Sequence, residues 1–179
     1  MKYLIFVGLS LTFCNSLVAQ SKLRLGLGYY GETIFHPGII VHAESDLLQK
    51  QKLSVPIRVG MGYYFHRYNH QALFADLVLG IRWHLGSRIY TGLSGGIGLM
   101  NSWHHSDHGV FKVGENGDIQ RISSFAGIDF MPSINAEIAY KLKRDSVHKS
   151  IWLRPIVFFQ NKVNDTVLLH FAMALGYTF

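Results

Sequence analysis

Along most of the chain, apolar and polar residues alternate with a period of two. Successive side chains of a β-strand point to opposite faces, so this alternation predicts strands that each have one apolar face. No stretch after residue 20 is apolar over the roughly 18 residues that a transmembrane helix needs, and no long window has the apolar spacing of an amphipathic helix. The alternating segments are Lys22–Gly31, Gly38–Asp46, Ser54–His66, His70–His84, Arg88–Asn101, Phe125–Lys141, Ser150–Gln160 and Val167–Phe179.

The two faces of these segments differ in composition. The apolar face carries none of the charges that fall within the segments. Those charges all lie on the second face: Lys22, Arg24, Glu44, Asp46, Arg58, Asp76, Arg82, Arg88, Asp129, Glu137, Lys141 and Arg154. Glycines gather on the same second face: Gly26, Gly28, Gly60, Gly62, Gly80, Gly92, Gly96, Gly98 and Gly176.

Two kinds of closed barrel alternate in this way. A soluble ligand carrier of the lipocalin type turns its apolar face inward, and its outer face should be dense in Lys and Glu rather than Gly. A membrane barrel turns its apolar face to lipid, and eight strands leave an interior just wide enough for side chains, where glycine saves space. Charged residues are only 16% of the chain. The sequence therefore predicts an all-β, eight-stranded antiparallel up-and-down transmembrane β-barrel, monomeric and with a filled lumen.

Aromatic residues of the apolar face fall into two groups. If both termini are periplasmic, the outer group is Tyr29, Tyr63, Phe65, Phe130, Phe159 and Phe171, and the periplasmic group is Trp83, Tyr140, Tyr177 and Phe179. Two such girdles are typical of membrane barrels. The predicted periplasmic connections are the short segments Leu47–Leu53, Leu85–Ser87 and Leu142–Lys149. The predicted outer connections include the much longer Ser102–Ser124. Short periplasmic turns and longer outer loops are the asymmetry expected of a membrane barrel.

The first residues have the pattern of a secretory leader. Lys2 is followed by an apolar run that is too short to span a bilayer, and Ala19 offers a small residue for cleavage. We expect a signal peptide over residues 1–19 and a barrel domain over 20–179. A lipoprotein signal at Cys14 is disfavoured because the bulky Phe13 precedes it. The mature chain would contain no cysteine and therefore no disulfide.

The last strand ends in alternating apolar residues and a terminal aromatic: Phe171, Met173, Leu175, Tyr177 and Phe179. At this point the chain resembles the small outer-membrane β-barrels of Gram-negative bacteria, the OmpX and OmpA-transmembrane-domain type, over essentially all of residues 20–179. The resemblance implies that these five residues are a signal read by the outer-membrane assembly machinery. It also implies export to the cell outer membrane and contact with its lipid, including lipopolysaccharide.

Charges on the inner face are expected to pair, because a buried charge is tolerated only with a partner. Simple hairpin registers place Arg24 opposite Glu44, and Glu137 opposite Arg154. They also place His42 opposite Arg58. Asp76 falls opposite Gly60 and diagonal to Arg58. We interpret Arg24, Glu44, Arg58, Asp76, Glu137 and Arg154 as an ion-pair core that plugs the lumen. The alternative is a proton or ion path.

The long outer connection contains a histidine-rich stretch. His104, His105, Asp107 and His108 are ligand types suited to zinc, copper or nickel. The alternative is a polar surface loop, because no spacing in this stretch fixes a coordination geometry. Other histidines also fall near the outer rim, where imidazoles could hold a metal when neutral or an anionic headgroup when protonated. They are His36, His66 and His70.

These features favour a structural or surface-interaction protein of the outer membrane without catalysis and without a cofactor. The alternative implied by the resemblance is a lipid-A-directed acyl hydrolase or acyltransferase. His104-x-Ser106 matches the His-x-Ser spacing of the deacylase group only formally, because it falls in a loop, and Asp107 with Ser106 and His66 could mimic the set of the palmitoyltransferase group. The formal net charge of +6 is spread along the chain and predicts no nucleic-acid partner.

Overall fold

The computed structural model describes residues 23–33, 36–66, 70–104, 110–113, 117–122, 127–143, 146–163 and 166–179. The predicted leader, 1–19, lies outside these residues. The strands are β1 (Arg24–Glu32), β2 (His36–Gln49), β3 (Leu53–Phe65), β4 (His70–Leu85), β5 (Ile89–His104), β6 (Val110–Val113), β7 (Ile119–Ile122), β8 (Gly127–Phe130), β9 (Ser133–Lys143), β10 (Ser146–Val163) and β11 (Thr166–Thr178). Within the described part of the chain, no helix is long and apolar enough to cross a membrane.

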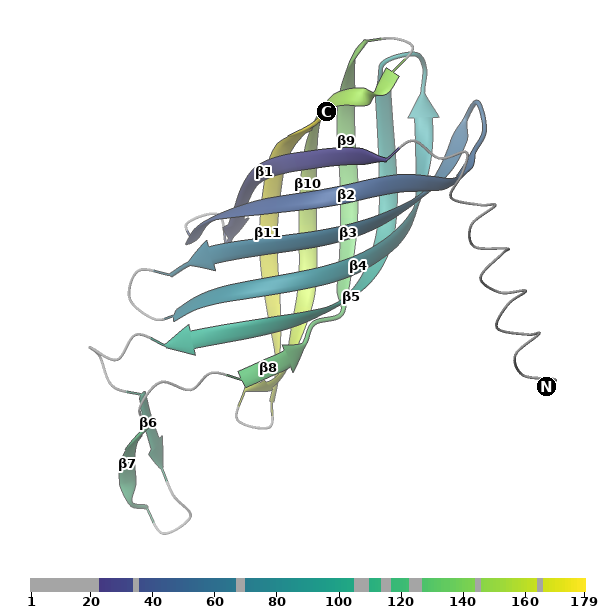
Figure 1. Cartoon of the computed structure of the whole chain (residues 1–179). Coiled ribbons are helices and arrows are strands. Elements are labelled where there is room, and N and C mark those ends of the chain that lie inside the picture. Colours follow the sequence, from purple (N-terminus) through teal and green to yellow (C-terminus); the bar gives the residue numbers. More distant parts are fainter. Residues whose placement is uncertain are drawn as a thin grey trace, which may run out of the picture.

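The main sheet closes on itself as an antiparallel barrel (Figure 1). Each strand from β1 to β5 pairs with the next, β5 pairs with β9, and β9, β10 and β11 continue the ring. β11 then pairs with β1, so that Gly26 lies opposite Thr178. The backbones of Leu25 and Phe179 complete this closure with two hydrogen bonds of 2.9 and 3.3 Å. The prediction of an all-β, eight-stranded antiparallel barrel is thereby confirmed.

One wall position of the ring is shared by β8 and β9. The predicted strand Phe125–Lys141 is interrupted at Met131 and Pro132, although both parts pair with β5 in the same register. Proline has no backbone N–H to give to the ladder, which explains the interruption. The neighbouring backbone stays bonded, because Met131 donates to Gly98 at 2.8 Å and Phe159 donates to Pro132 at 3.0 Å.

A second, two-stranded sheet lies within the long connection between β5 and β8. β6 pairs with β7 and joins no strand of the barrel. Figure 1 shows this hairpin projecting from the end of the barrel opposite the C-terminus. We call that end the loop mouth, and we call the other end, where β1 begins and β11 ends, the terminal mouth.

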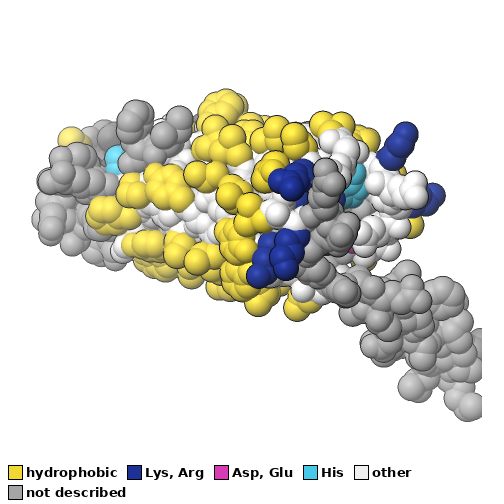
Figure 2. Space-filling view, turned by 90° about the horizontal axis from the view of Figure 1, so that it is seen from above, with side chains coloured by type: hydrophobic (Ala, Val, Ile, Leu, Met, Phe, Trp, Pro, Cys, Tyr) yellow, Lys and Arg dark blue, Asp and Glu magenta, His cyan; other side chains and the backbone are white. Residues whose placement is uncertain are grey.

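The outer wall is an apolar belt. Side chains at alternate positions, such as Leu77, Ile97 and Ile134, are 44–57% exposed although they are aliphatic and lie in the middle of strands. Figure 2 shows hydrophobic side chains spread over the middle of the barrel on the face in view. The predicted girdle residues that are most exposed are also on this surface: Tyr29, Trp83, Phe130, Tyr140, Phe171 and Phe179. The phase of the alternation is therefore the one predicted for a barrel that faces lipid.

The lumen is filled by two layers of side chains. Toward the loop mouth, an aromatic layer packs around Tyr30, whose ring lies 4.9 Å from that of Phe74 and 5.8 Å from that of Tyr64. The sequence pattern predicted a polar interior and did not indicate this apolar layer. Toward the terminal mouth, the interior holds charged side chains, most of them less than 9% exposed.

Candidate functional site

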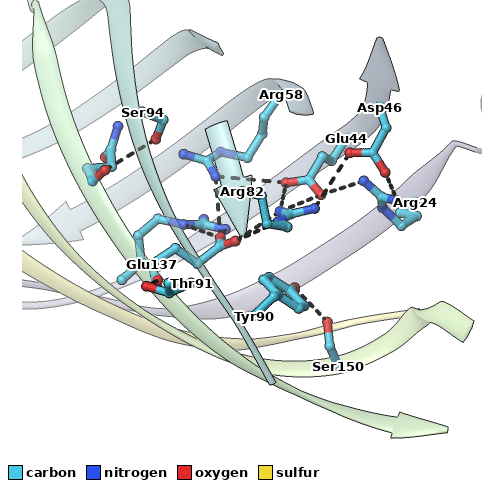
Figure 3. Close-up of polar contacts among 12 residues, drawn as sticks. Arg24, Glu44, Asp46, Arg58, Arg82, Tyr90, Thr91, Ser94, Glu137 and Ser150 are labelled. Carbon is cyan, nitrogen blue, oxygen red and sulfur yellow. Dashed lines mark hydrogen bonds and ion pairs between the residues drawn. The ribbon is translucent and has the colours of Figure 1, made fainter. Parts of the chain in front are cut away.

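Two carboxylates organise the charged layer of the lumen (Figure 3). Arg82, from β4, reaches across the interior and donates to Glu44 of β2 at 2.8 Å and to Glu137 of β9 at 2.9 Å. All three side chains are at most 8% exposed. The guanidinium of Arg82 therefore links two walls of the barrel that are not neighbours in the sheet.

Other arginines extend the network toward both sides. Arg24 donates to Glu44 at 2.8 Å and to Asp46 at 2.6 Å. On the wall formed by β9 and β10, Arg154 donates through Nε to Oε2 of Glu137 at 3.0 Å and also contacts the same oxygen through Nη2. Charge-assisted hydrogen bonds of this kind are about twice as strong as those between neutral groups.

Aromatic rings stack on two of the arginines, Arg82 and Arg154. The guanidinium of Arg82 lies 4.4 Å from the ring centre of Tyr90, and that of Arg154 lies 4.2 Å from the ring centre of Trp152. A cavity beside Arg82 and Glu137 measures about 10 Å³, which is the room of a single water molecule at most. At this level the described interior is filled by paired charges and stacked rings.

Three of the four predicted cross-strand registers agree with the structure. Arg24 lies opposite Glu44, and Gly60 lies opposite Asp76. The β9–β10 ladder that brackets Glu137 and Arg154 has the predicted register, and the two side chains bond directly.

The predicted register of His42 with Arg58 is wrong, because His42 lies opposite Gly60, and Arg58 lies opposite Glu44. β2 continues to Gln49, so its turn to β3 comes later than predicted. The ladder also shifts by one residue between Asp46 and Leu48. Arg58 still belongs to the network, at 3.9 Å from Glu44 and 3.7 Å from Glu137.

The network differs in membership from the predicted set. Asp76 faces inward but takes part in none of the ion pairs formed by the described residues, and its Oδ1 is buried without a hydrogen-bond partner. Arg82 and Asp46 were not in the set, although both lie on the charged face. Cross-strand registers relate neighbouring strands only, whereas Arg82 bonds across the lumen.

A second cluster lies at the loop mouth around a buried glutamate. Glu32 bonds through one oxygen to Nδ1 of His36 at 3.0 Å and through the other to Nδ1 of His170 at 2.6 Å. The ring of His66 lies 3.7 Å from that of His36 and 5.6 Å from that of His70. The three predicted rim histidines are therefore together. Glu32 and His170 join them, which the sequence pattern does not indicate.

The predicted metal ligands cannot be placed in the same way. His105, Asp107 and His108 lie outside the described residues, and for His104 only the backbone is described, opposite His70. Among the residues that the structure describes, no group of three or more His, Cys, Asp or Glu side chains is arranged to hold a metal ion. The metal site in the long outer connection stays a prediction.

Comparison with known proteins gives the fold. No protein-family model and no curated protein matches the chain. Among solved structures, Ail, the attachment invasion locus protein of Yersinia pestis, matches with a TM-score of 0.50 and 10% identity over 89% of this chain and 97% of that chain. Neisserial surface protein A has a TM-score of 0.47 and 7% identity over 87% and 91%. The outer membrane enzyme PagL has a TM-score of 0.44 and 15% identity over 87% and 97%. At these identities the likeness is one of fold, that of the small eight-stranded outer-membrane barrels.

Proposed function

We propose that this chain is a structural or surface-interaction protein of the outer membrane, that it acts without catalysis, and that its lumen is sealed. The observation that carries the proposal is the pairing of an apolar outer belt with an interior whose charged side chains are buried and joined in ion pairs. The belt suits a bilayer. The sealed interior argues against a pore, so the parts of the chain that meet other molecules are its surfaces.

We place the contact surface on the long connection Ser102–Ser124. Its β6–β7 hairpin has a sheet of its own, and Ile119 in β7 is 70% exposed. The hairpin projects from the loop mouth (Figure 1), where another molecule can reach it. In this proposal the terminal mouth is periplasmic, the loop mouth faces outward, and lipopolysaccharide is the lipid around the outer half of the belt.

Surface labelling tests this placement. Gly117 lies between β6 and β7 with a φ of +81° and no heavy atom within 4 Å of where a side chain would begin, so an epitope inserted after it should leave the barrel intact. Antibody should label intact cells that carry this insertion. The same epitope inserted after Gly86, in the turn between β4 and β5, should be labelled only after the cells are permeabilised. Equal labelling of both insertions in intact cells, or of neither, would contradict the proposed orientation.

Mass spectrometry of lipid A tests the absence of catalysis. Cells with and without the gene should contain lipid A with the same acyl chains. A change in the number of acyl chains that depends on the gene would replace the proposal by the alternative of a lipid-A-directed hydrolase or acyltransferase.

A further inference from the structure

The terminal mouth contains a polar cavity of about 420 Å³. It lies between the β2–β3 turn, the β4–β5 turn and the end of β9. This volume is in the range of about 300–1,000 Å³ found for small-molecule sites. The residues that line the cavity are Gln49, Lys50, Gln51, His84, Gly86, Ser87 and Lys141. All of them except the glycine carry a side-chain hydrogen-bond donor, and none carries a carboxylate.

Lys141 is the unusual member of this lining. Its side chain is on the inner face of β9 and the residue is only 7% exposed, yet it takes part in none of the ion pairs formed by the described residues. Its Nζ lies 3.3 Å from Nδ1 of His84 and 5.9 Å from the ring centre of Tyr90. A buried ammonium ordinarily has an anionic partner, so Lys141 retains an unmet requirement for negative charge.

The carboxylates nearest to this cavity form ion pairs with arginines. Asp46 accepts from Arg24 at 2.6 Å and lies 3.7 Å from Arg82. Glu44 is likewise bonded to both of these arginines. The carboxylates of this layer form their ion pairs with guanidinium groups, and Asp46 attracts the ammonium of Lys141 without forming an ion pair with it.

The rim around the cavity is also basic. Figure 2 shows Lys and Arg side chains gathered at one end of the apolar belt. The exposed cations of the described residues at the terminal mouth are Lys50, Lys52, Arg88, Lys143 and Lys149. The side-chain carboxylates described near this end, Glu44 and Asp46, are at most 8% exposed. Among the described side chains, the exposed charges at this mouth are therefore positive.

We propose that the cavity of the terminal mouth binds a phosphate-bearing anion through Lys50, His84 and Lys141. Two ammonium groups supply charge-assisted bonds to phosphate oxygens. Because protonated Lys141 donates to Nδ1 of His84, the hydrogen of a neutral imidazole is on Nε2, where it is a further donor. The phosphate group can belong to a phospholipid headgroup of the inner leaflet or to a soluble phosphate ester. The assignment to that leaflet rests on the proposed function, whereas the binding chemistry does not.

Calorimetric titration of the folded barrel in a nonionic detergent tests the site. The two probes are sn-glycerol 3-phosphate and short-chain phosphatidylglycerol, and glycerol is the uncharged control. Saturable binding of either probe, with none of glycerol, is expected. Binding of both probes identifies the phosphate group itself as the determinant, and binding of phosphatidylglycerol alone identifies the headgroup of a lipid.

Matched variants locate the binding. The double variant Lys50→Gln/Lys141→Gln should weaken the affinity at least tenfold, because each substitution removes a charge-assisted bond. Lys143→Gln, an exposed lysine that does not line the cavity, should change the affinity less than twofold. Lys50→Gln alone, on an exposed side chain, should still weaken binding at least threefold if the buried Lys141→Gln change prevents folding. Heat-modifiable migration in electrophoresis verifies that each variant is folded.

The absence of saturable binding of both probes would overturn the proposal, as would a double variant that is folded and binds like the wild type. Because these titrations use the purified barrel in detergent, their failure would leave the surface-labelling result untouched. Failure of the surface labelling would likewise leave the titrations unaffected.

Discussion

At the scale of single residues, the carboxylate of Glu137 is the most consequential side chain of the plug. It is bonded to Arg82 and Arg154 and lies 3.7 Å from Arg58. Glu137→Gln would leave these buried guanidinium groups short of a counter-charge and should lower the free energy of unfolding by about 3–5 kcal/mol. Asp76→Asn is the matched control, because Asp76 faces the same interior outside the ion pairs, and it should cost far less. Urea unfolding in detergent measures both.

A double-mutant cycle between Glu137 and Arg154 separates the pair from the rest of the plug. Replacing both with apolar residues should cost less than the sum of the two single changes, because neither charge is then stranded. A coupling energy near zero would show that the direct bond between them does not contribute to stability.

Gly176 allows a test of packing in the lumen. A methyl group at this position would overlap the ring of Trp152, which is 1% exposed and cannot withdraw into solvent. Gly176→Ala should therefore destabilise the barrel by about 1–3 kcal/mol, the usual cost of overpacking. At Gly95 the nearest atom to the added carbon is 4.0 Å away, so Gly95→Ala should be tolerated. Equal thermal stability of the two variants would contradict this packing.

Residue contacts could be predicted from the sequence only where they follow from one hairpin. The pair of Glu137 with Arg154 depends on a single turn and was predicted. The bonds of Arg82 to Glu44 and Glu137 depend on how the closed ring brings distant strands face to face. A register worked out from one hairpin relates only the two strands of that hairpin, so it cannot predict these bonds. The grouping of Glu32 with His170 also needs the closure of β1 on β11.

At the scale of elements, β4 offers a test of which face meets lipid. Leu77 is in the middle of this strand and 44% exposed, whereas Leu85 is at its end and 60% exposed. Leu77→Arg should cost about 2–4 kcal/mol in a bilayer, and Leu85→Arg about 0–1 kcal/mol, because the penalty falls toward the interface. Unfolding of both variants in lipid vesicles measures the difference. Similar costs at the two depths would contradict the placement of the belt.

The last strand, β11, is predicted to carry the assembly signal. Phe179 is 53% exposed and its backbone closes the barrel against Leu25, so deleting it removes hydrogen bonds together with the ring. Phe179→Ser keeps the backbone and should still sharply lower the amount of heat-modifiable barrel in the outer membrane. Phe171→Ser removes an aromatic residue from the same face of β11, farther from the terminus, and should have a smaller effect. Wild-type amounts of Phe179→Ser barrel would contradict the role of the terminal residue.

Period-two alternation was sufficient to locate the wall strands, because the lipid-facing side of each tolerates no charge. It was insufficient where the chain departs from alternation. The alternation has the same phase on both sides of the break at Pro132, so the pattern alone predicts one continuous strand. The β6–β7 hairpin is built of two strands of four residues each, too short for a period to be recognised. The β2–β3 ladder shifts by one residue between Asp46 and Leu48. The register of these two strands therefore cannot be predicted from the length of their turn alone.

At the scale of the whole molecule, the closed ring combines four features along its axis. The histidine cluster around Glu32 lies at the loop mouth, the aromatic layer and the ion-paired plug fill the middle, and the basic cavity around Lys141 lies at the terminal mouth. The two ends therefore differ in chemistry, and in our proposal the middle is sealed. This arrangement supports a protein that contacts other molecules at its ends and conducts nothing between them.

Electrical recording tests the sealed lumen most directly. The purified barrel, inserted in a planar lipid bilayer with potassium chloride on both sides, should show no steady conductance above that of the bare membrane. Insertion is verified separately, by protection of the strands from protease in vesicles of the same lipid. A stable conductance that scales linearly with voltage in verified, wild-type protein would contradict the plug formed around Glu44, Arg82 and Glu137.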